Sequence, residues 1–208
     1  MIKKSDSIVK LLQAIAYQIG NQVSYNELSQ IVGLDPKTIQ KYIHILEQAF
    51  IIFRLPSFAR NLRNELKTTQ KIYFWDTGIR NSIIRRFAPI DMRDDVGALW
   101  ENFIIAEILK SDHNDERFSL SYFWRTNTQL EIDLVQDHNG ELSAYEIKRN
   151  PKKSKPLPKI FMETYMPKVS HTITRDNWLG IVGKGRKRDL KGRERDLKGL
   201  VKGKEKGW

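Results

Sequence analysis

A β-hairpin is predicted by the stretch Glu131-Ile-Asp-Leu-Val-Gln-Asp-His-Asn-Gly-Glu-Leu-Ser-Ala-Tyr-Glu-Ile-Lys148. Two strand candidates flank Asn139-Gly140, a pair that tolerates the positive φ angles of a tight turn. Side chains two residues apart on a strand share a face, so Glu146 and Lys148 project together. The hairpin carries Asp133 on the neighbouring strand, where we expect it to converge with Glu146.

This convergence points to a metal site. Two neighbouring carboxylates repel each other unless a cation joins them. A hard cation such as Mg²⁺ or Mn²⁺ suits Asp133 and Glu146, because it takes one or two carboxylates plus waters. Such a metal activates water and neutralises charge on a phosphate. Lys148 would then orient the attacking water or stabilise the transition state, and Glu101 on the preceding helix would complete the metal shell.

The elements around the hairpin predict an α/β arrangement within a chain that is α+β overall. A helix begins at Asp94 or Asp95 and runs through Leu109. The expected order is helix, three strands, helix and strand, with the last five elements at residues 119–124, 130–136, 142–148, 158–166 and 169–173. This order defines a second domain at 89–178.

The motif residues also carry a resemblance. Asp133 followed by Glu146-Ile-Lys148 resembles the D…(D/E)xK signature of the restriction-endonuclease-like superfamily, whose core has the same αβββαβ order. More narrowly, residues 22–178 resemble the uncharacterised C-terminal region of a family of prokaryotic AAA-type ATPases. The residues that carry this likeness are Lys71-Ile-Tyr-Phe-Trp-Asp-Thr-Gly78, Gly97-Ala-Leu-Trp-Glu-Asn-Phe103, Glu131-Ile-Asp133 and Tyr145-Glu-Ile-Lys148.

The family resemblance implies a winged helix followed by a nuclease-like domain, both downstream of an ATPase domain. It favours Glu101 over Glu107 as the helix-borne site residue. Glu131 shares the face of Asp133 by the period of two and is a candidate additional ligand. The favoured interpretation is that it is an ordinary exposed residue of the strand. No Gly-x-x-x-x-Gly-Lys-Ser/Thr motif occurs in the 208 residues, so we expect no ATP hydrolysis from this chain, although an ATPase remains a candidate partner.

The first 88 residues predict a winged helix-turn-helix domain. A helix runs from Asp6 toward Gly20, and Ser24 with Glu27 begins a short second helix. Asp35 and Pro36 begin the third helix. Two β-rich segments follow at 51–53 and 72–74, and the basic residues between them, Arg60, Arg63 and Lys67, predict the wing. Away from the apolar stripe of the third helix lie the candidate DNA contacts Lys37, Thr38, Gln40, Lys41 and His44.

The charge of the chain is concentrated at its end. Of 36 Lys and Arg residues and 25 Asp and Glu residues, 11 and 4 lie in 179–208, which leaves 25 and 21 for the rest. This basic tail is glycine-rich and repetitive, and we expect it to be disordered. The sequence has no cysteine and no apolar run long enough to span a membrane, which predicts a cytoplasmic protein without disulfides or thiolate metal sites.

Two functions therefore stay open. One is a DNA-associated protein with an Mg²⁺- or Mn²⁺-dependent nuclease-like domain that cleaves phosphodiester bonds. The other is a non-catalytic DNA-binding or accessory fragment of an AAA-type ATPase. The sequence leaves the oligomeric state and the choice between DNA and RNA open.

Overall fold

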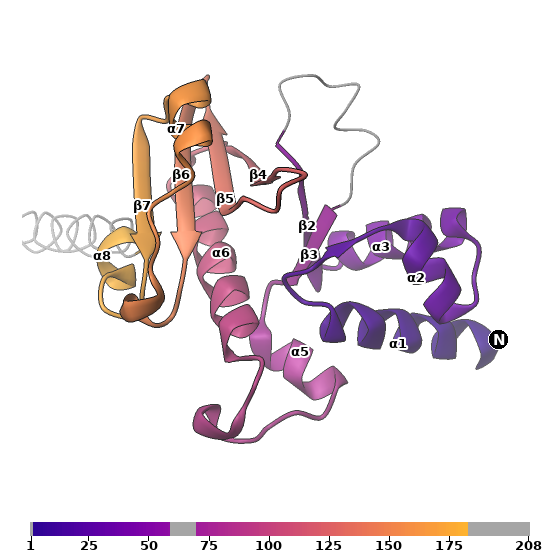
Figure 1. The fold of residues 1–208 in the computed structure, drawn as a ribbon. Helices are drawn as coiled ribbons and strands as arrows, with labels where there is room; N and C mark the ends of the chain where they lie inside the picture. Colours follow the sequence, from indigo (N-terminus) through magenta and orange to yellow (C-terminus); the bar gives the residue numbers. More distant parts are fainter. Residues whose placement is uncertain (1, 59–69, 183–208) are drawn as a thin grey trace, which may run out of the picture.

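The computed structural model describes residues 2–58 and 70–182, in which helices alternate with two β-sheets (Figure 1). This confirms the predicted α+β class. Arg60, Arg63 and Lys67, which predict a wing, lie outside the described residues, and so does the tail from residue 183 onward. Among the helices in the described ranges, none is both long enough and apolar enough to cross a membrane.

Three helices begin the chain, and they are α1 (Ile2–Tyr17), α2 (Tyr25–Val32) and α3 (Pro36–Gln48). The predicted caps are confirmed, because the Glu27 N–H donates to Ser24 Oγ at 3.2 Å and the Thr38 N–H donates to Asp35 Oδ1 at 3.0 Å. Gly33 ends α2 with a left-handed φ of 77°, which glycine adopts without strain. One apolar core holds the helices together through Leu11, Ile15, Leu28, Ile39 and Ile43.

A small antiparallel sheet follows these helices. Its strands are β1 (Gln22–Val23), β2 (Ile52–Pro56) and β3 (Gln70–Phe74), in the order β1-β3-β2. The pairs Ile52↔Phe74 and Leu55↔Lys71 fix the register of β2 against β3. Strand β3 is the central strand, and its side chains from Lys71 to Phe74 are buried, the polar Lys71 as well as the apolar Ile72.

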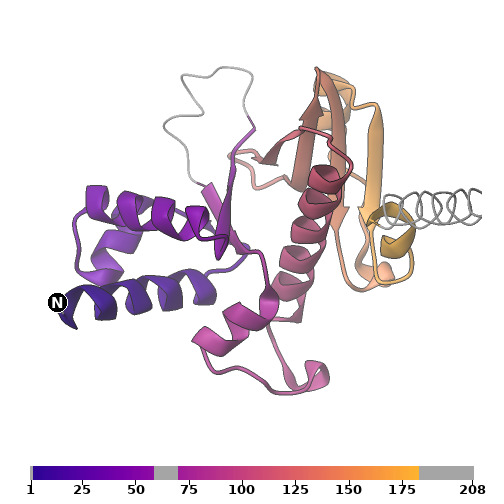
Figure 2. The ribbon, with the colours of Figure 1, turned by 180° about the vertical axis from the view of Figure 1, so that it is seen from behind.

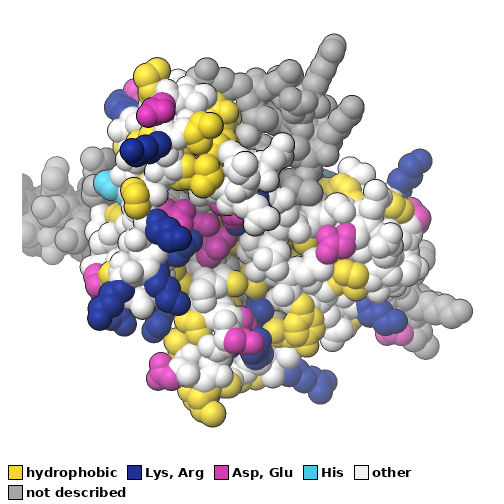
Figure 3. All heavy atoms as spheres, viewed as in Figure 1, with side chains coloured by type: hydrophobic (Ala, Val, Ile, Leu, Met, Phe, Trp, Pro, Cys, Tyr) yellow, Lys and Arg dark blue, Asp and Glu magenta, His cyan; other side chains and the backbone are white. Residues whose placement is uncertain are grey.

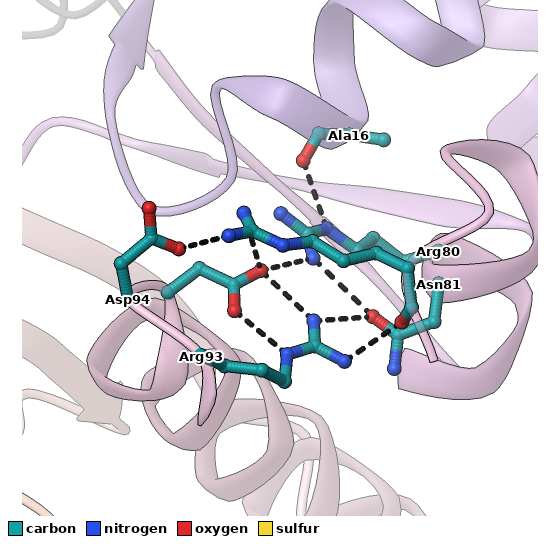
Figure 4. A network of polar contacts seen from close by, with 7 residues as sticks. Ala16, Arg80, Asn81, Arg93 and Asp94 are labelled. Carbon is teal, nitrogen blue, oxygen red and sulfur yellow. Dashed lines mark hydrogen bonds and ion pairs between the residues drawn. The ribbon is translucent and has the colours of Figure 1, made fainter. Parts of the chain in front are cut away.

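The segment after β3 carries elements that the sequence patterns did not predict, α5 (Thr77–Ile83) and the 3₁₀ turn η1 (Ile90–Met92). Its polar residues form a network with the fully buried Arg80 at its centre (Figure 4). Arg80 Nε donates to the Ala16 carbonyl of α1 at 2.8 Å, and Arg80 Nη1 lies 2.5 Å from Asp95 Oδ2. The network therefore ties α1 to the start of the next long helix.

That helix is α6 (Val96–Asn114), and Asp95 is its N-cap residue, as predicted, although the Asp95 side chain makes no capping hydrogen bond. The Asp95 carboxylate instead accepts hydrogen bonds from Arg93 Nε at 2.9 Å and from Arg80. These bonds, first the one from Arg93 and then the one from Arg80, hold the pKa of Asp95 well below its usual range.

The second sheet has four strands, β4 (Leu120–Arg125), β5 (Glu131–His138), β6 (Glu141–Ile147) and β7 (Val169–Ile173), in that spatial order. The hairpin turn is confirmed, since Asn139 and Gly140 both have positive φ angles (54° and 85°). Figures 1 and 2 show α6 across one face of this sheet and α7 (Lys159–Tyr165) on the other. The element order is the one predicted.

Helix α7 covers its face through a small apolar core that contains Phe161, Trp124, Leu142 and Ala144, and the rings of Phe161 and Trp124 lie 5.0 Å apart between centroids. The connection from β6 to α7 contains the 3₁₀ turn η2 (Pro151–Lys153). Residues 179–182, which the sequence assigned to the tail, belong instead to α8 (Trp178–Val182), and Val182 is buried. The apolar run Ile181-Val182 packs on the core with α6 and so extends the folded part beyond the expected boundary.

The two sheets are joined directly. Ser57, just after β2, forms a parallel bridge with Phe123 of β4, and the Phe58 N–H donates to the Phe123 carbonyl at 2.6 Å. The ring of Phe58 packs edge-on against Tyr165 of α7 at 5.2 Å between centroids. The N-terminal half thus contributes side chains to the core of the second half, and residues from both halves meet at the junction.

Candidate functional site

A β-bulge in β5 carries the first site residue, Asp133. Tyr122 pairs with Val135 and Trp124 pairs with Ile132, so Asp133 and Leu134 lie opposite a single residue of β4. Bulges bend a strand locally and redirect its side chains. The Asp133 carboxylate accepts the Ile147 N–H at 2.7 Å and is only 6% exposed, so it is held firmly beside the end of β6.

Glu146 and Lys148 lie at that end of β6. Lys148 Nζ is 2.7 Å from Glu146 Oε1 and 3.3 Å from Asp133 Oδ2. The lysine side chain is 37% exposed, whereas that of Glu146 is 14% exposed. The structure therefore brings Asp133, Glu146 and Lys148 together as the sequence predicted, with the ammonium group facing solvent and the carboxylates behind it.

Glu101 approaches the same cluster from α6, and two residues of β3 contact it. Lys71 Nζ lies 3.0 Å from Glu101 Oε1, and the Tyr73 hydroxyl donates to the same oxygen at 2.5 Å. Lys71 Nζ also lies 2.5 Å from Glu131 Oε1, although the lysine side chain is only 2% exposed. A buried ammonium from the N-terminal half therefore joins Glu101 and Glu131 of the second half.

Sequence reasoning missed Lys71 and Tyr73, although one signal was available. The segment Lys71-Ile-Tyr73-Phe is apolar apart from its lysine, and Lys71 and Tyr73 share a face by the period of two. A lysine on a buried strand requires a carboxylate partner. The partner could not be identified from the sequence, because Glu101 is 30 residues away and on a different element.

Gly20 completes the wall beside Glu101. Its φ of 80° is left-handed, and a side chain built on it would begin 3.6 Å from Glu101 Oε1. Glycine therefore serves the left-handed turn after α1, whereas a Cβ at this position would make only an ordinary van der Waals contact with the carboxylate. Glu107, the alternative to Glu101, is further along α6 and pairs with Lys110 at 2.9 Å.

Burial and mutual repulsion disturb the titration of these acids. Burial, followed by the negative charge of Asp133, raises the pKa of Glu101 to about 7 against the attraction of Lys71. The same two causes, in the same order, raise the pKa of Glu146. Burial lowers the pKa of Lys71, but attraction to Glu101, Glu131 and Asp133 outweighs it, so the pKa is raised and the lysine stays charged. The acids thus lack full charge compensation from the protein.

Oxygen donors of this kind suit a hard divalent cation. Within the described residues no group of three or more Asp, Glu or His side chains is arranged to hold a metal ion. Asp133 and Glu146 alone still match the preference of Mg²⁺ for one or two carboxylates completed by waters. Figure 3 shows acidic side chains gathered in a hollow between the two halves, with Lys and Arg side chains at its rim.

The other predicted site residues lie on α3, on the far side of β2 and β3 from this hollow (Figures 1 and 2). Thr38 is half-buried, and its hydroxyl donates to Asp35 Oδ2 at 2.6 Å, so it serves the helix cap. The remaining four side chains are exposed, as expected from their position outside the apolar stripe: Lys37, Gln40, Lys41 and His44.

Comparisons with known proteins divide the chain close to residue 89, where the second domain is predicted to begin. Residues 1–89 match a domain of unknown function (DUF8612), and residues 96–180 match a second one (DUF4143), an AAA-ATPase-associated C-terminal domain type. Similar curated proteins are the uncharacterized proteins Rv2008c of Mycobacterium tuberculosis and Mb2031c of Mycobacterium bovis. Each is 26% identical over 138 residues, which are 65% of this chain and 30% of the relative.

No solved structure matches the chain. The chain spans about 30% of the length of the curated relatives it matches. The first part of the chain thus matches DUF8612 and the second part matches DUF4143. The acidic cluster of Glu101, Glu131, Asp133 and Glu146 lies where these two regions meet, because Lys71 of the first contacts Glu101 of the second.

Proposed function

We propose that the second half is a restriction-endonuclease-like domain that hydrolyses phosphodiester bonds of DNA with Mg²⁺ or Mn²⁺. The observation that carries this proposal is the convergence of Asp133, Glu146 and Lys148. Lys148 Nζ lies within 3.3 Å of both carboxylates, and all three side chains come from the ends of neighbouring strands. The αβββαβ order of elements supports the same assignment.

In this proposal Asp133 and Glu146 hold the metal, which when bound supplies a Lewis acid and a source of activated water. Asp133 is pre-oriented by its bond from the Ile147 N–H. Lys148 donates hydrogen bonds to the attacking water or to a phosphate oxygen and compensates the charge that develops there. Glu101 is the third candidate ligand, through Oε2, because its Oε1 is engaged by Lys71 and Tyr73.

The N-terminal half would act as a winged helix that holds DNA near the site. Lys37 and Lys41 suit phosphates, while Gln40 and His44 can reach base edges. The exposure of these four side chains on α3 supports this role, whereas the hydroxyl and the N–H of Thr38 are both used in the cap at Asp35.

Incubation of supercoiled, linear and branched DNA with the full chain and Mn²⁺ tests the nuclease proposal. We expect metal-dependent products from the wild type and none from Lys148→Ala. Lys168→Ala is a matched control, since Lys168 is an exposed lysine paired with Glu141 at 2.6 Å outside the cluster, and it should cleave like the wild type. Equal cleavage by the wild type and Lys148→Ala would refute the assignment.

A second candidate function is an accessory segment of an ATPase. The match of residues 96–180 to an AAA-ATPase-associated domain type favours it, and so does the longer length of the curated relatives. In that case the acidic cluster is a structural ion-pair network closed by Lys71. A wild type that neither cleaves DNA nor gains thermal stability with Mn²⁺ would favour this candidate.

A further inference from the structure

The connection between β6 and α7 is the most basic segment in the described part of the chain that faces solvent. Its residues 149–159, here called the basic connection, contain Arg149, Lys152, Lys153, Lys155 and Lys159 and no Asp or Glu. It directly follows Lys148. We propose that the basic connection binds the phosphate backbone of a nucleic acid strand and holds it against the acidic site. The proposal rests on the proposed function for its choice of polyanion.

The cations of this segment have no acidic partner among the residues that the structure describes. Lys152, Lys153, Lys155 and Lys159 are exposed, and within the described residues none of them, nor Arg149, forms an ion pair. Other surface cations of the second half have acidic partners, for example Lys110 with Glu107 and Lys168 with Glu141. Uncompensated charge concentrated in one short segment creates a local positive potential that attracts polyanions.

The backbone of the basic connection is held in a defined conformation by a hydrogen bond, an apolar contact and three prolines. Asn150 Oδ1 accepts the Lys152 N–H at 3.0 Å and begins the 3₁₀ turn. Leu157 packs on the small core beneath α7. The prolines at 151, 156 and 158 restrict the backbone further. The lysines are therefore presented from a defined backbone, which reduces the entropy lost when they bind a partner.

The segment also lies on the correct face of the sheet. The Thr172 hydroxyl donates to the Lys155 carbonyl at 3.4 Å, so the connection passes over β7 at Thr172. Thr172 pairs with Glu146 in the parallel β6–β7 register, and paired residues project from the same face. Lys155 is thus anchored on the face from which Glu146 and Lys148 project. Figure 3 shows Lys and Arg side chains beside the hollow in which acidic side chains gather.

The arrangement of charges indicates which ligand the basic connection binds. Glu101, Glu131, Asp133 and Glu146 would repel a phosphodiester that approached the site alone. A row of cations next to the acids offsets this repulsion and fixes the register of the backbone without reading its bases. We therefore expect binding that is insensitive to base sequence and strongly dependent on salt.

Fluorescence anisotropy of the full chain with a labelled DNA duplex and a labelled single strand tests the inference. EDTA is present, so that catalysis does not enter the measurement. The test variant is the triple substitution Lys152→Gln, Lys153→Gln, Lys155→Gln. The matched control removes the same charge elsewhere through Lys10→Gln, Lys110→Gln, Lys168→Gln, and both must keep the wild-type circular dichroism spectrum. The residues beyond 182 are common to all three proteins.

We expect the test variant to bind at least about tenfold more weakly than the wild type and the control to stay within about twofold. The slope of log affinity against log salt should fall by about 2 to 3 for duplex DNA in the test variant, since three phosphate contacts are lost. Equal losses in the two triple variants, or no loss in either, would overturn the inference. Binding to anionic phosphatidylserine vesicles without binding to DNA would overturn it as well.

This experiment separates the inference from the proposed function. If the wild type cleaves DNA and the test variant binds DNA normally, the nuclease proposal stands and the inference about the basic connection is wrong. If the wild type does not cleave DNA but the test variant alone binds DNA more weakly, the DNA-binding surface stands and the catalytic assignment is wrong.

Discussion

Lys71 Nζ lies 3.0 Å from Glu101 Oε1 and only 2% of the lysine side chain is exposed, so a strand of the N-terminal half neutralises a carboxylate on the main helix of the second half. The same ammonium contacts Glu131 at 2.5 Å and lies 5.7 Å from the ring centre of Phe123. The two halves thus share a buried ion pair at the edge of the acidic site. The N-terminal half is consequently part of the electrostatics of that site.

Removal of this cation should destabilise the whole chain. Lys71→Met removes the buried cation that Glu101 and the partly exposed Glu131 share, and loss of one member of a buried pair costs about 3–5 kcal/mol. The double variant Lys71→Met, Glu101→Gln should recover part of the loss because it removes the unpaired charge. Urea denaturation measures both effects. A loss below about 1 kcal/mol in Lys71→Met would show that the pair contributes little to folding.

The stability of the wild type should fall as the pH rises from about 4.5 to 7. The pKa of Glu101 is about 7 in the folded chain, against an ordinary value of 4.5, so the folded state binds the proton more tightly. The resulting stabilisation is complete below pH 4.5 and is lost as the pH passes 7. The difference between the two pKa values corresponds to about 3.5 kcal/mol at most, at about 1.4 kcal/mol for each pH unit.

Urea denaturation of the wild type and Glu101→Gln over this pH range checks that dependence. Glu101→Gln cannot titrate, so its stability should change less with pH than that of the wild type. The difference between the two proteins isolates Glu101 from other acids, including Glu146. Parallel pH profiles would mean that Glu101 titrates normally in the folded chain.

Substitutions of Asp133 should separate its structural role from its role toward a metal. Asp133→Asn keeps an oxygen acceptor for the Ile147 N–H, whereas Asp133→Ala leaves that N–H unsatisfied at a cost of about 1–3 kcal/mol. The wild type should gain thermal stability with millimolar Mn²⁺, by about 2.7 kcal/mol at a hundredfold excess over Kd. Asp133→Asn should fold without this gain. A Mn²⁺ response retained in Asp133→Asn would argue against Asp133 as a ligand.

The arginine network offers a comparison between a buried and a partly exposed cation. Arg80→Met removes the contacts to the Ala16 carbonyl and to Asp95, and should cost about 3–5 kcal/mol because Arg80 is buried. Arg86 pairs with Asp94 but is 36% exposed, so Arg86→Met should cost less than about 1 kcal/mol. Thermal denaturation distinguishes them. Similar losses in the two variants would mean that burial does not determine the strength of this network.

Much of the second half could be predicted because its signals are local. The Asn139-Gly140 turn and the period of two determine which side chains of β6 share a face, and this was sufficient to bring Glu146 and Lys148 together with Asp133. The caps Ser24 and Asp35 are equally local, since their partners lie three residues further along the chain.

The parts that could not be predicted depend on contacts between distant segments. Lys71 is buried only because β3 packs against α6 and β5, and the sequence does not specify that packing. The Asp95 side chain makes no capping hydrogen bond to α6, because Arg80 and Arg93 bind its carboxylate. The bulge at Asp133 arises from the register of β5 against β4, which alternation alone does not reveal.

The central claim is that Asp133, Glu146 and Lys148 form a metal-dependent site for phosphodiester hydrolysis. Its most direct test is the single-turnover rate of cleavage of a labelled DNA substrate with saturating Mn²⁺, for the wild type and Lys148→Ala. We expect the variant to be slower by about 100-fold or more, as is typical when a group that stabilises transition-state charge is removed. Equal rates in the two proteins, or no cleavage by the wild type on any DNA form, would contradict the claim.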